Sequence, residues 1–450
     1  MTGRNQEPDH IYDLIGVGIG PFNLGLAALL DEVDEVDALF FDRKNTFNWH
    51  PGMLIDGTTL QVPFFADLVS MADVRSRYSF LNYLQEHDRM YQFYFLEKFH
   101  IPRKEYNHYC QWVADQLEYC WFRISVENVR MIDQNGTSLY EVRVWNEDAG
   151  EFETYLTKDL AIGIGSSPTV PEWMKPHLGD TVFHSADYLN RKNTCMNADS
   201  ITVIGSGQSA AEVFYDLAKE QEEREYSLNW YTRSQGFFPM EYSKLGLEYF
   251  SPDFTDFFYE LPQFKKDGLI KQQDLLYKGI SAETIADIYD LLYERSIGGE
   301  KPAIRLQAMM ELSKMEQKVN AWGLDFTHTV TEDTVSDSSD IVILGTGYNS
   351  TVPEFLAGLE DVIDWDVQGR YQVSRDYRLQ MKQESRNEIF VQNGELHTHG
   401  VGAPDLGLGA NRNAVIINQL AGSEIYPVRS KNVFQTFGGM KKGLRELARV

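Results

Sequence analysis

Residues 12–21 read YDLIGVGIGP, an apolar run that passes directly into a glycine-rich turn and a proline. This pattern predicts a strand followed by a helix, in which backbone amides of the turn approach a pyrophosphate at the positive end of the helix. We expect Gly16 and Gly18 to make the tight turn and the close approach, with Gly20 completing the cradle. Pro21 occupies the third fingerprint position, so the strict pattern fails there, although proline suits a first helical turn.

The next predicted strand, residues 38–41, ends in Asp42. A carboxylate about twenty residues after the glycine turn can bind ribose hydroxyl groups. Strand, glycines, helix and acid together favour a dinucleotide site over an accidental glycine pattern.

Residues 201–212 (ITVIGSGQSAAE) repeat the design and satisfy the fingerprint, with alanine in its last place. The candidate contacts are Gly205, Ser206, Gly207, Gln208 and Ser209. The strand that follows ends in Arg233 rather than in an acid. A guanidinium can pair bidentately with a ribose 2′-phosphate, which a carboxylate would repel. The sequence therefore favours NADP over NAD, with a solvated surface arginine as the alternative.

A third stretch, residues 341–348 (IVILGTGY), ends in a similar turn, with Thr346 and Gly347 as candidate cofactor contacts. Two dinucleotide sites in one chain imply electron transfer between two cofactors, so we assign FAD to the first site and NADPH to the second. The predicted fold is α/β, with two Rossmann-like dinucleotide-binding domains and a small, mostly helical substrate-binding region.

The expected division of the chain has three parts. Residues 1–170 form the first part of the FAD-binding domain, and an Asn135-Gly136 turn there predicts an antiparallel meander. Residues 171–340 form the NADPH-binding domain, with a helical insertion at about 253–315. Residues 341–450 complete the FAD-binding domain and end in a basic amphipathic helix from Asn432 to Val450.

Composition excludes several function classes. With 67 acidic and 41 basic residues among 450, the formal charge is −26, which argues against a nucleic-acid partner and slightly favours a cationic small molecule over an anionic one. Three cysteines without a Cys-x-x-Cys motif indicate a reducing compartment. The polar N-terminus has no signal-peptide pattern, and glycines interrupt the apolar residues 14–30, so we expect a cytoplasmic protein with no membrane partner.

Other candidate residues lie in loops. Trp49 and His50 either pack in a Pro/Gly loop or stack on a flavin, and the Gln61 amide is suited to flavin heteroatoms or a bound peroxide. His397 and His399 have no third ligand at metal-binding spacing, so no metal site is predicted. We expect the glycine-rich loop that follows to close over the flavin through Leu406 and Leu408. Motifs of metallohydrolases, serine hydrolases and P-loop ATPases do not occur.

Taken in order, these motifs resemble one family: the flavin-dependent N-hydroxylating monooxygenases of siderophore biosynthesis, which act on ornithine, lysine or diamines. The segments that carry the likeness are residues 16–23, 49–52, 61 with 67–68, 78–84, 205–212 and 345–348. The resemblance covers nearly the whole chain. It implies FAD, NADPH and O2, a C4a-hydroperoxyflavin, a hydroxylamine product later acylated to a hydroxamate, and a cytosolic homo-oligomer, either a tetramer or a dimer.

Two departures from the family pattern bear on the substrate. The amino-acid hydroxylases carry a lysine, which pairs with the substrate carboxylate, where this chain has Ala66. They carry an asparagine where it has Leu247, beside Glu248. Leaving a buried carboxylate unpaired costs about 3–5 kcal/mol. The resemblance therefore implies a diamine, with cadaverine favoured and putrescine next, and a desferrioxamine-type pathway.

The reacting amine must be neutral, whereas its reference pKa is about 10.4, so the site has to desolvate it. The far ammonium needs a carboxylate. Asp405 is the first candidate for this anchor and Glu248 the second, and a turn-capping role is the alternative for Asp405. Lys244 is a candidate contact to NADP phosphate or to the substrate, with a solvated lysine as the alternative.

Three other functions are compatible with two nucleotide sites: L-lysine N6-hydroxylation, another class B flavin monooxygenase reaction, and a non-catalytic nucleotide-binding redox sensor. A disulfide oxidoreductase would need a redox pair of cysteines, and the spacing of Cys110, Cys120 and Cys195 offers none.

Overall fold

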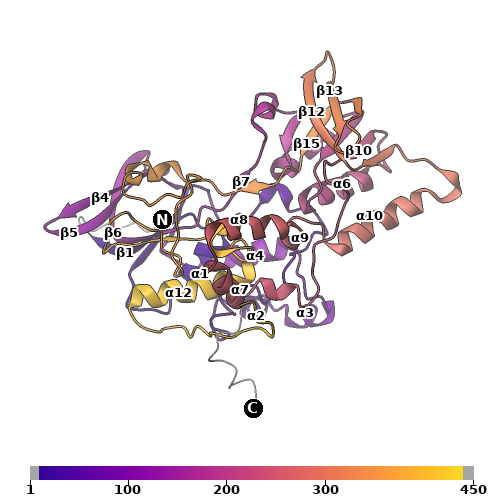
Figure 1. Ribbon diagram of the computed structural model, residues 1–450. Helices are drawn as coiled ribbons and strands as arrows, with labels where there is room; N and C mark the ends of the chain where they lie inside the picture. Colours follow the sequence, from indigo (N-terminus) through magenta and orange to yellow (C-terminus); the bar gives the residue numbers. More distant parts are fainter. Residues whose placement is uncertain (1–9, 439–450) are drawn as a thin grey trace.

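The glycine-containing strand at the N-terminus lies inside a seven-stranded sheet. The computed structural model describes residues 10–438 (Figure 1). Strand β1 (Ile11–Val17) is flanked by the parallel strands β2 (Ala38–Asp42) and β6 (Glu151–Ile162), and β3 (Cys120–Phe122) lies beyond β2. The end of β1 is fully buried, because Leu14 packs in a core cluster with α1 and Ile15 packs in a second cluster with the antiparallel strands of the sheet.

The predicted meander forms the other half of this sheet. Strands β4 (Ile124–Gln134), β5 (Thr137–Asn146) and β6 pair antiparallel, and the end of β6 also pairs with β17 (Ile389–Val391). Asn135 and Gly136 both have positive φ, at 56° and 83°, as a two-residue hairpin turn requires. The prediction of the meander and of its turn is confirmed.

The second sheet is wholly parallel, in the order β11-β10-β9-β15-β8. Its strands are β8 (Val182–His184), β9 (Ser200–Ile204), β10 (Ser227–Tyr231), β11 (Ile304–Gln307) and β15 (Ile341–Leu344). The expected boundary at residue 341 therefore falls too early, because β15 pairs with β9 inside this sheet. The chain crosses between the two halves at the antiparallel pair β7 (Ser167–Pro168) and β16 (Tyr348–Asn349), visible between the sheets in Figure 1.

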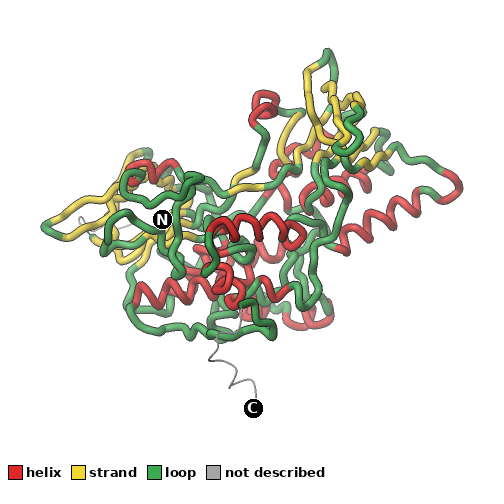
Figure 2. Tube along the Cα trace, in the orientation of Figure 1, coloured by secondary structure: helices red, strands yellow, loops and turns green. Residues whose placement is uncertain are grey.

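Helices occupy the space between and below the sheets (Figure 2). Those of the first half are α1 (Pro21–Leu30), α2 (Phe80–Glu86), α3 (Met90–Leu96), α4 (Arg103–Ala114), α11 (Leu396–His399) and α12 (Gly409–Ala421). Those of the second are α5 (Tyr188–Cys195) and α6 (Gln208–Glu220). The insertion contains α7 (Pro252–Tyr259), α8 (Gln263–Gln272), α9 (Asp274–Tyr277) and α10 (Ala282–Arg295).

Two expectations about helices need correction. The insertion stops being helical after residue 299. Its last part forms β11, which belongs to the parallel sheet, and the start of β12 (Met310–Gln317), which forms a three-stranded antiparallel sheet with β13 (Trp322–His328) and β14 (Thr334–Ser339). Alternation explains this, because Met310 and Leu312 are buried with Glu311 exposed between them. Residues 432–438 form a loop rather than a helix, and the rest of the expected C-terminal helix lies outside the described residues.

Across residues 10–438, every helix is too short or too polar to cross a membrane.

Candidate active site

The glycines of the first turn have two roles: two of them allow the strands to pack closely, and the third leaves space for a ligand. A Cβ at Gly16 would lie 2.1 Å from the Phe40 ring, and one at Gly18, whose φ is +87°, would lie 2.7 Å from the Gly163 carbonyl oxygen. These two glycines allow the strands to pack. At Gly20 the nearest atom would be 3.7 Å away, so the start of α1, with Pro21 at its first position, stays open to a ligand.

Asn23, a residue that the motif analysis did not single out, holds this turn together. Its side chain is fully buried, and its Nδ2 donates to the carbonyl oxygens of Val17, Gly18 and Ala161 at 3.2, 2.8 and 3.2 Å. Its Oδ1 accepts from Gln392 Nε2 at 2.8 Å. A polar residue inside an otherwise apolar helix was the available signal, because a buried amide needs partners.

Asp42 also supports the turn. Its Oδ2 accepts from the Ile19 amide and its Oδ1 from the Lys44 amide, both at 2.8 Å. Each carboxylate oxygen has a second lone pair, so these bonds leave room for a ribose hydroxyl.

The second glycine turn is built in the same way. Gly205 has a φ of +134°, and a Cβ there would lie 2.2 Å from the Gly345 carbonyl oxygen. Gly207 precedes α6 and keeps its nearest neighbour at 3.7 Å, so this helix start is also open. Ser206 Oγ bonds Ser234 Oγ at 2.8 Å.

Arg233 extends from the end of β10 into solvent. Its side chain is 78% exposed, and its nearest carboxylate, Glu311, is 3.7 Å away. A guanidinium in that state is available to a phosphate that approaches the open end of α6.

The remaining fingerprint residues join the two halves of the molecule. Gln208 donates to Glu212 and Thr284 at 2.7 and 3.0 Å, and accepts from the Ser281 amide at 2.7 Å. Glu212 in turn receives both Nη atoms of Arg103, the first residue of α4, each at 2.7 Å. Gln208 therefore has a structural role beside any cofactor contact.

His50 lies at this junction with a neutral ring. Burial, together with the nearby charges of Arg103 and Lys44, lowers the pKa of His50 to about 4. Its ring contacts Trp49 and Tyr348 edge-on, with centroids 5.0 and 5.6 Å apart. Packing, one of the two readings of Trp49 and His50, is thus realised at the boundary between the two sheets.

Three more predicted contacts lie nearby. Thr346 Oγ1 donates to the Thr169 carbonyl at 2.5 Å, and the Gly347 carbonyl accepts from the Thr169 amide at 2.9 Å, so both brace the crossover. Ser209 is a side-chain partner of Tyr348.

Gln61 carries a buried amide nitrogen, Nε2, with no hydrogen-bond partner among the described residues. A buried donor without a partner is costly, which points to a missing acceptor.

Asp405 begins the 3-10 helix Leu406–Leu408 and accepts from the Gly407 amide at 2.8 Å, so the turn-capping role is realised. Burial raises the pKa of Asp405 to about 6, although Gly407 and Arg412 oppose this. Its charge, added to burial, raises the pKa of Tyr242, which sequence reasoning missed.

Ala66 lies beside this loop. Its side chain is 5% exposed, and a Cβ at Gly407 would be 3.8 Å from the Ala66 Cβ. A small cavity of about 10 Å³ is lined by Leu406 of this loop, by Pro21 at the start of α1 and by Asp67. The loop therefore lies next to the start of α1, where the flavin is expected. The structure thus brings together residues 66, 405 and the start of α1. Leu408 is buried under the same loop.

Arg412 is a buried cation that could in principle replace the missing lysine, but its guanidinium already has other partners. It pairs with Glu395 at 3.0 Å and donates to the Ala403 carbonyl at 2.7 Å. The Phe22 and Tyr377 rings lie 4.9 and 5.3 Å from its guanidinium carbon. It supports the loop rather than offering a free charge.

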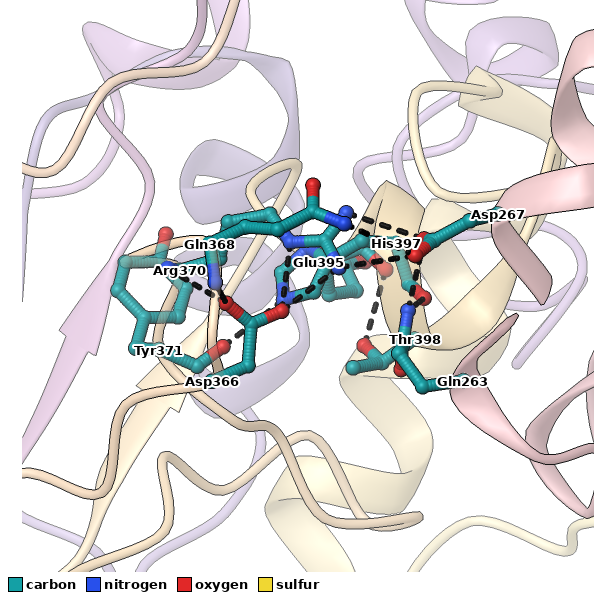
Figure 3. A network of polar contacts seen from close by, with 9 residues as sticks. All are labelled: Gln263, Asp267, Asp366, Gln368, Arg370, Tyr371, Glu395, His397 and Thr398. Atoms are coloured by element: carbon teal, nitrogen blue, oxygen red, sulfur yellow. Dashed lines mark hydrogen bonds and ion pairs between the residues drawn. The ribbon is translucent and has the colours of Figure 1, made fainter.

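A polar network fixes the base of the same loop to the helical insertion (Figure 3). Arg370 bridges Asp267 of α8 and Asp366, at 3.1 and 2.7 Å. Gln263 donates to the His397 carbonyl at 2.9 Å, and His397 Nε2 bonds the Tyr371 carbonyl at 2.8 Å. His399 Nε2 lies 3.4 Å from a different carbonyl, that of Arg375, so both histidines have structural partners.

The other substrate candidates lie on the segment before α7. Both carboxylate oxygens of Glu248 accept backbone amides, from Phe434 at 3.0 Å and Gln435 at 2.8 Å, so Glu248 already has a structural role. Leu247 is 41% exposed, and Lys244 is exposed on the same segment.

Comparison with known proteins gives consistent matches. The family described as L-lysine 6-monooxygenase/L-ornithine 5-monooxygenase matches residues 10–350. The putrescine N-hydroxylase of Shewanella oneidensis is 44% identical over 97% of this chain and 86% of its own. The structure of DfoA bound to FAD, the cadaverine monooxygenase of desferrioxamine biosynthesis in Erwinia amylovora, superposes with a TM-score of 0.92, at 40% identity over 96% of this chain and 100% of that one.

A Kutzneria ornithine N-hydroxylase, KtzI, with reduced FAD, NADP+ and L-ornithine, superposes with a TM-score of 0.84, at 25% identity over 91% of this chain and 99% of that one.

Proposed function

Since the chain belongs to the L-lysine 6-monooxygenase/L-ornithine 5-monooxygenase family, we propose that it N-hydroxylates an aliphatic diamine, cadaverine in preference to putrescine. The enzyme is a flavin-dependent N-hydroxylating monooxygenase that uses FAD, NADPH and O2. Its product is an N-hydroxydiamine for a hydroxamate siderophore of the desferrioxamine type.

The observation that supports a diamine is that the site contains a carboxylate, Asp405, and has alanine, Ala66, where a cation would be needed to pair with a substrate carboxylate. Asp405 lies on the loop beside which Ala66 packs, and the buried Arg412, whose charge acts on Asp405, is already paired with Glu395. A carboxylate there attracts the far ammonium of a diamine. The α-carboxylate of an amino acid would meet Asp405 with like charge and no counter-ion.

The two glycine turns have the shape that the cofactors need. Gly20, Pro21, Asp42, Trp49, His50, Gln61, Leu406 and Leu408 would hold FAD. Ser206, Gly207, Gln208, Ser209 and Arg233 would hold NADPH. Once reduced by NADPH, the flavin supplies the activated oxygen. The unpartnered Nε2 of Gln61 offers a donor on the flavin side, and the neutral His50 adds no positive charge there.

The protein's own contribution to substrate chemistry is to hold the two amines of the diamine in different protonation states. Asp405 keeps the far amine protonated, and the closed loop desolvates the reacting amine so that its free base is populated. The phenol of Tyr242 is held neutral by burial and by the charge of Asp405. Its aromatic ring is a surface near that carboxylate to which a cation is attracted.

The test is hydroxylamine formation with FAD and NADPH, measured for cadaverine, putrescine, L-lysine and L-ornithine, with the product identified by mass. We expect N-hydroxydiamine from both diamines, with the larger kcat/KM for cadaverine. Equal or better turnover of L-lysine would replace the proposal with L-lysine N6-hydroxylation. NADPH binding without substrate-stimulated oxidation would leave the redox sensor.

We further propose a homo-oligomer, a dimer or tetramer, in the cytoplasm. None of the residues of α3 is buried, and its Tyr91, Tyr94 and Phe95 side chains are 78%, 70% and 73% exposed, as at an interaction surface. The cysteines at 110, 120 and 195 are buried and free of disulfides, which suits a reducing compartment.

A further inference from the structure

The last described segment, residues 431–438, lies on the outside of the region that carries the proposed substrate site. We refer to it as the C-terminal strap. It follows α12 in sequence and runs below that helix toward α7 (Figure 1). Its contacts fall on residues 245–257, the segment that carries Leu247, Glu248 and α7.

Glu248 holds the middle of the strap. Its two oxygens accept the consecutive amides of Phe434 and Gln435, at 3.0 and 2.8 Å. Gln435 returns a bond from its Nε2 to the Leu245 carbonyl at 2.6 Å. Three bonds therefore fix the strap to the loop that the sequence aligns with the amino-acid head-group site.

Asp253, near the start of α7, holds the beginning of the strap. Its Oδ2 accepts from both the backbone and the side-chain nitrogen of Asn432, each at 2.9 Å. Lys431 Nζ lies 3.1 Å from the other oxygen. The Asp253 side chain is only 9% exposed, whereas its partner Lys431 is 54% exposed.

Phe437 attaches the end of the strap to an aromatic cluster. Its ring centroid lies 5.0 Å from that of Phe254, 5.3 Å from Tyr249 and 6.4 Å from Phe257. By contrast, Phe434 is 96% exposed. The strap thus presents one packed and one exposed phenylalanine, only three positions apart.

The inner face of α7 supports the loop that leads to Asp405. A Cβ at Gly400, whose φ is +80°, would lie 3.0 Å from the Phe258 ring, and one at Gly402 would lie 3.4 Å from Thr255 Oγ1. Val401 is fully buried in the same apolar cluster as Phe254 and Phe258. The helix that the strap clamps on one side is therefore the packing surface for residues 400–402 on the other.

We infer that the C-terminal strap is a positioning element for the diamine site, in which Glu248 and Phe437 act as positioning residues that hold α7 against the Asp405 loop. This inference rests on the proposed function for its substrate. Neither residue contacts the reacting atoms. The strap acts by fixing where the far-ammonium carboxylate sits.

Phe437→Ala and Glu248→Gln are the test variants, and Phe434→Ala is the matched control. Glu248→Gln keeps the size of the side chain but leaves one oxygen for two amides. Both test variants should raise the KM for cadaverine at least about fivefold with little change in kcat, the signature of lost binding. Phe434→Ala should keep the wild-type values. FAD content and NADPH oxidation without diamine should be unchanged in all three.

Hydrogen exchange of the FAD-loaded proteins gives a readout that does not depend on turnover. Phe437→Ala should speed exchange at residues 400–408, and Phe434→Ala should not. Wild-type exchange there together with a wild-type KM in both test variants would overturn the inference and leave the diamine function intact. A wild-type protein that hydroxylates no diamine would overturn the proposed function, and the exchange result would still decide whether the strap holds the loop.

Discussion

Asp405 combines two properties at the scale of a single residue: it caps the turn of its own loop, and its pKa is raised to about 6 by burial. Its carboxylate is therefore charged at neutral pH but loses that charge within a mildly acidic range. In the proposed site this single group carries the recognition of the far ammonium.

A dependence on pH follows from that pKa. Above about 6 Asp405 is charged and binds the far ammonium, and below it protonation removes the anchor, so the KM for cadaverine should rise as pH falls through about 6. Asp405→Asn should raise the KM at neutral pH by about 30-fold or more, since losing one partner of a buried charge pair costs about 2–5 kcal/mol. It should also abolish the acid limb. A pH profile of KM for both proteins checks this, and an acid limb that persists in Asp405→Asn contradicts it.

Arg233 allows a second test at this scale. Arg233→Ala should raise the KM for NADPH about tenfold or more while changing the KM for NADH little, because only NADPH has the 2′-phosphate. The comparison is made by steady-state oxidation of both nucleotides. Equal weakening of the two would assign Arg233 to the exposed surface instead.

The role of a residue was predictable where the backbone geometry requires that residue type. It was less predictable where the partners of a side chain come from distant parts of the sequence. The glycines at 16, 18 and 205 follow from the motif alone. Asn23 was missed because its partners come from strands far apart in sequence. The structural role of Glu248 was missed because nothing in its local sequence reveals that the amides of residues 434 and 435 bond its oxygens.

At the scale of elements, α4 and α6 are tied by a buried ion pair across the two halves of the molecule. Arg103 and Glu212 form two bonds of 2.7 Å, with side chains 14% and 4% exposed. Such a pair sets orientation more surely than it adds stability, since its desolvation offsets its attraction.

Breaking one side of this pair should be costly. Arg103→Met should destabilise the protein by about 3–5 kcal/mol, because it leaves Glu212 buried and unpaired. Arg103→Met with Glu212→Leu should recover most of that loss. Thermal unfolding of the FAD-loaded proteins measures both, and a double variant no more stable than Arg103→Met would show that the cost does not come from the unpaired carboxylate.

The elements themselves were predictable to different degrees. The glycine-turn strands and the meander were predicted because their signals are local. The stretch from residue 304 to 315 was assigned to the helical insertion, although it forms β11 and most of β12, and burial alternates at the start of β12. The placement of β15 in the second sheet depends on pairing with β9 and β8, which no local pattern encodes.

At the scale of the whole molecule, two dinucleotide cradles are joined by a short crossover and by the α4–α6 contact. The predicted fold class is confirmed by structures of this family. The assembly beyond one chain is proposed from α3, whose Tyr91, Tyr94 and Phe95 side chains are largely exposed.

Disrupting that face should separate the subunits. Tyr94→Ser combined with Phe95→Ser should shift the mass measured by light scattering toward the monomer, because it removes apolar area from the surface. Val319→Ser, at a 98% exposed position on a loop outside α3, is the control and should leave the mass unchanged. A wild-type monomer, or an unaltered assembly in the double variant, would rule out α3 as the interface.

The most direct test of the diamine site is the ratio of kcat/KM for cadaverine to that for L-lysine, in the wild type and in Ala66→Lys. We predict a wild-type ratio above about 100, as expected for a buried carboxylate left without a counter-ion. We also predict a ratio at least about tenfold lower in Ala66→Lys, because the new ammonium pairs with the substrate carboxylate and repels the far ammonium. A wild-type ratio near one, or a ratio that Ala66→Lys does not change, would contradict the assignment.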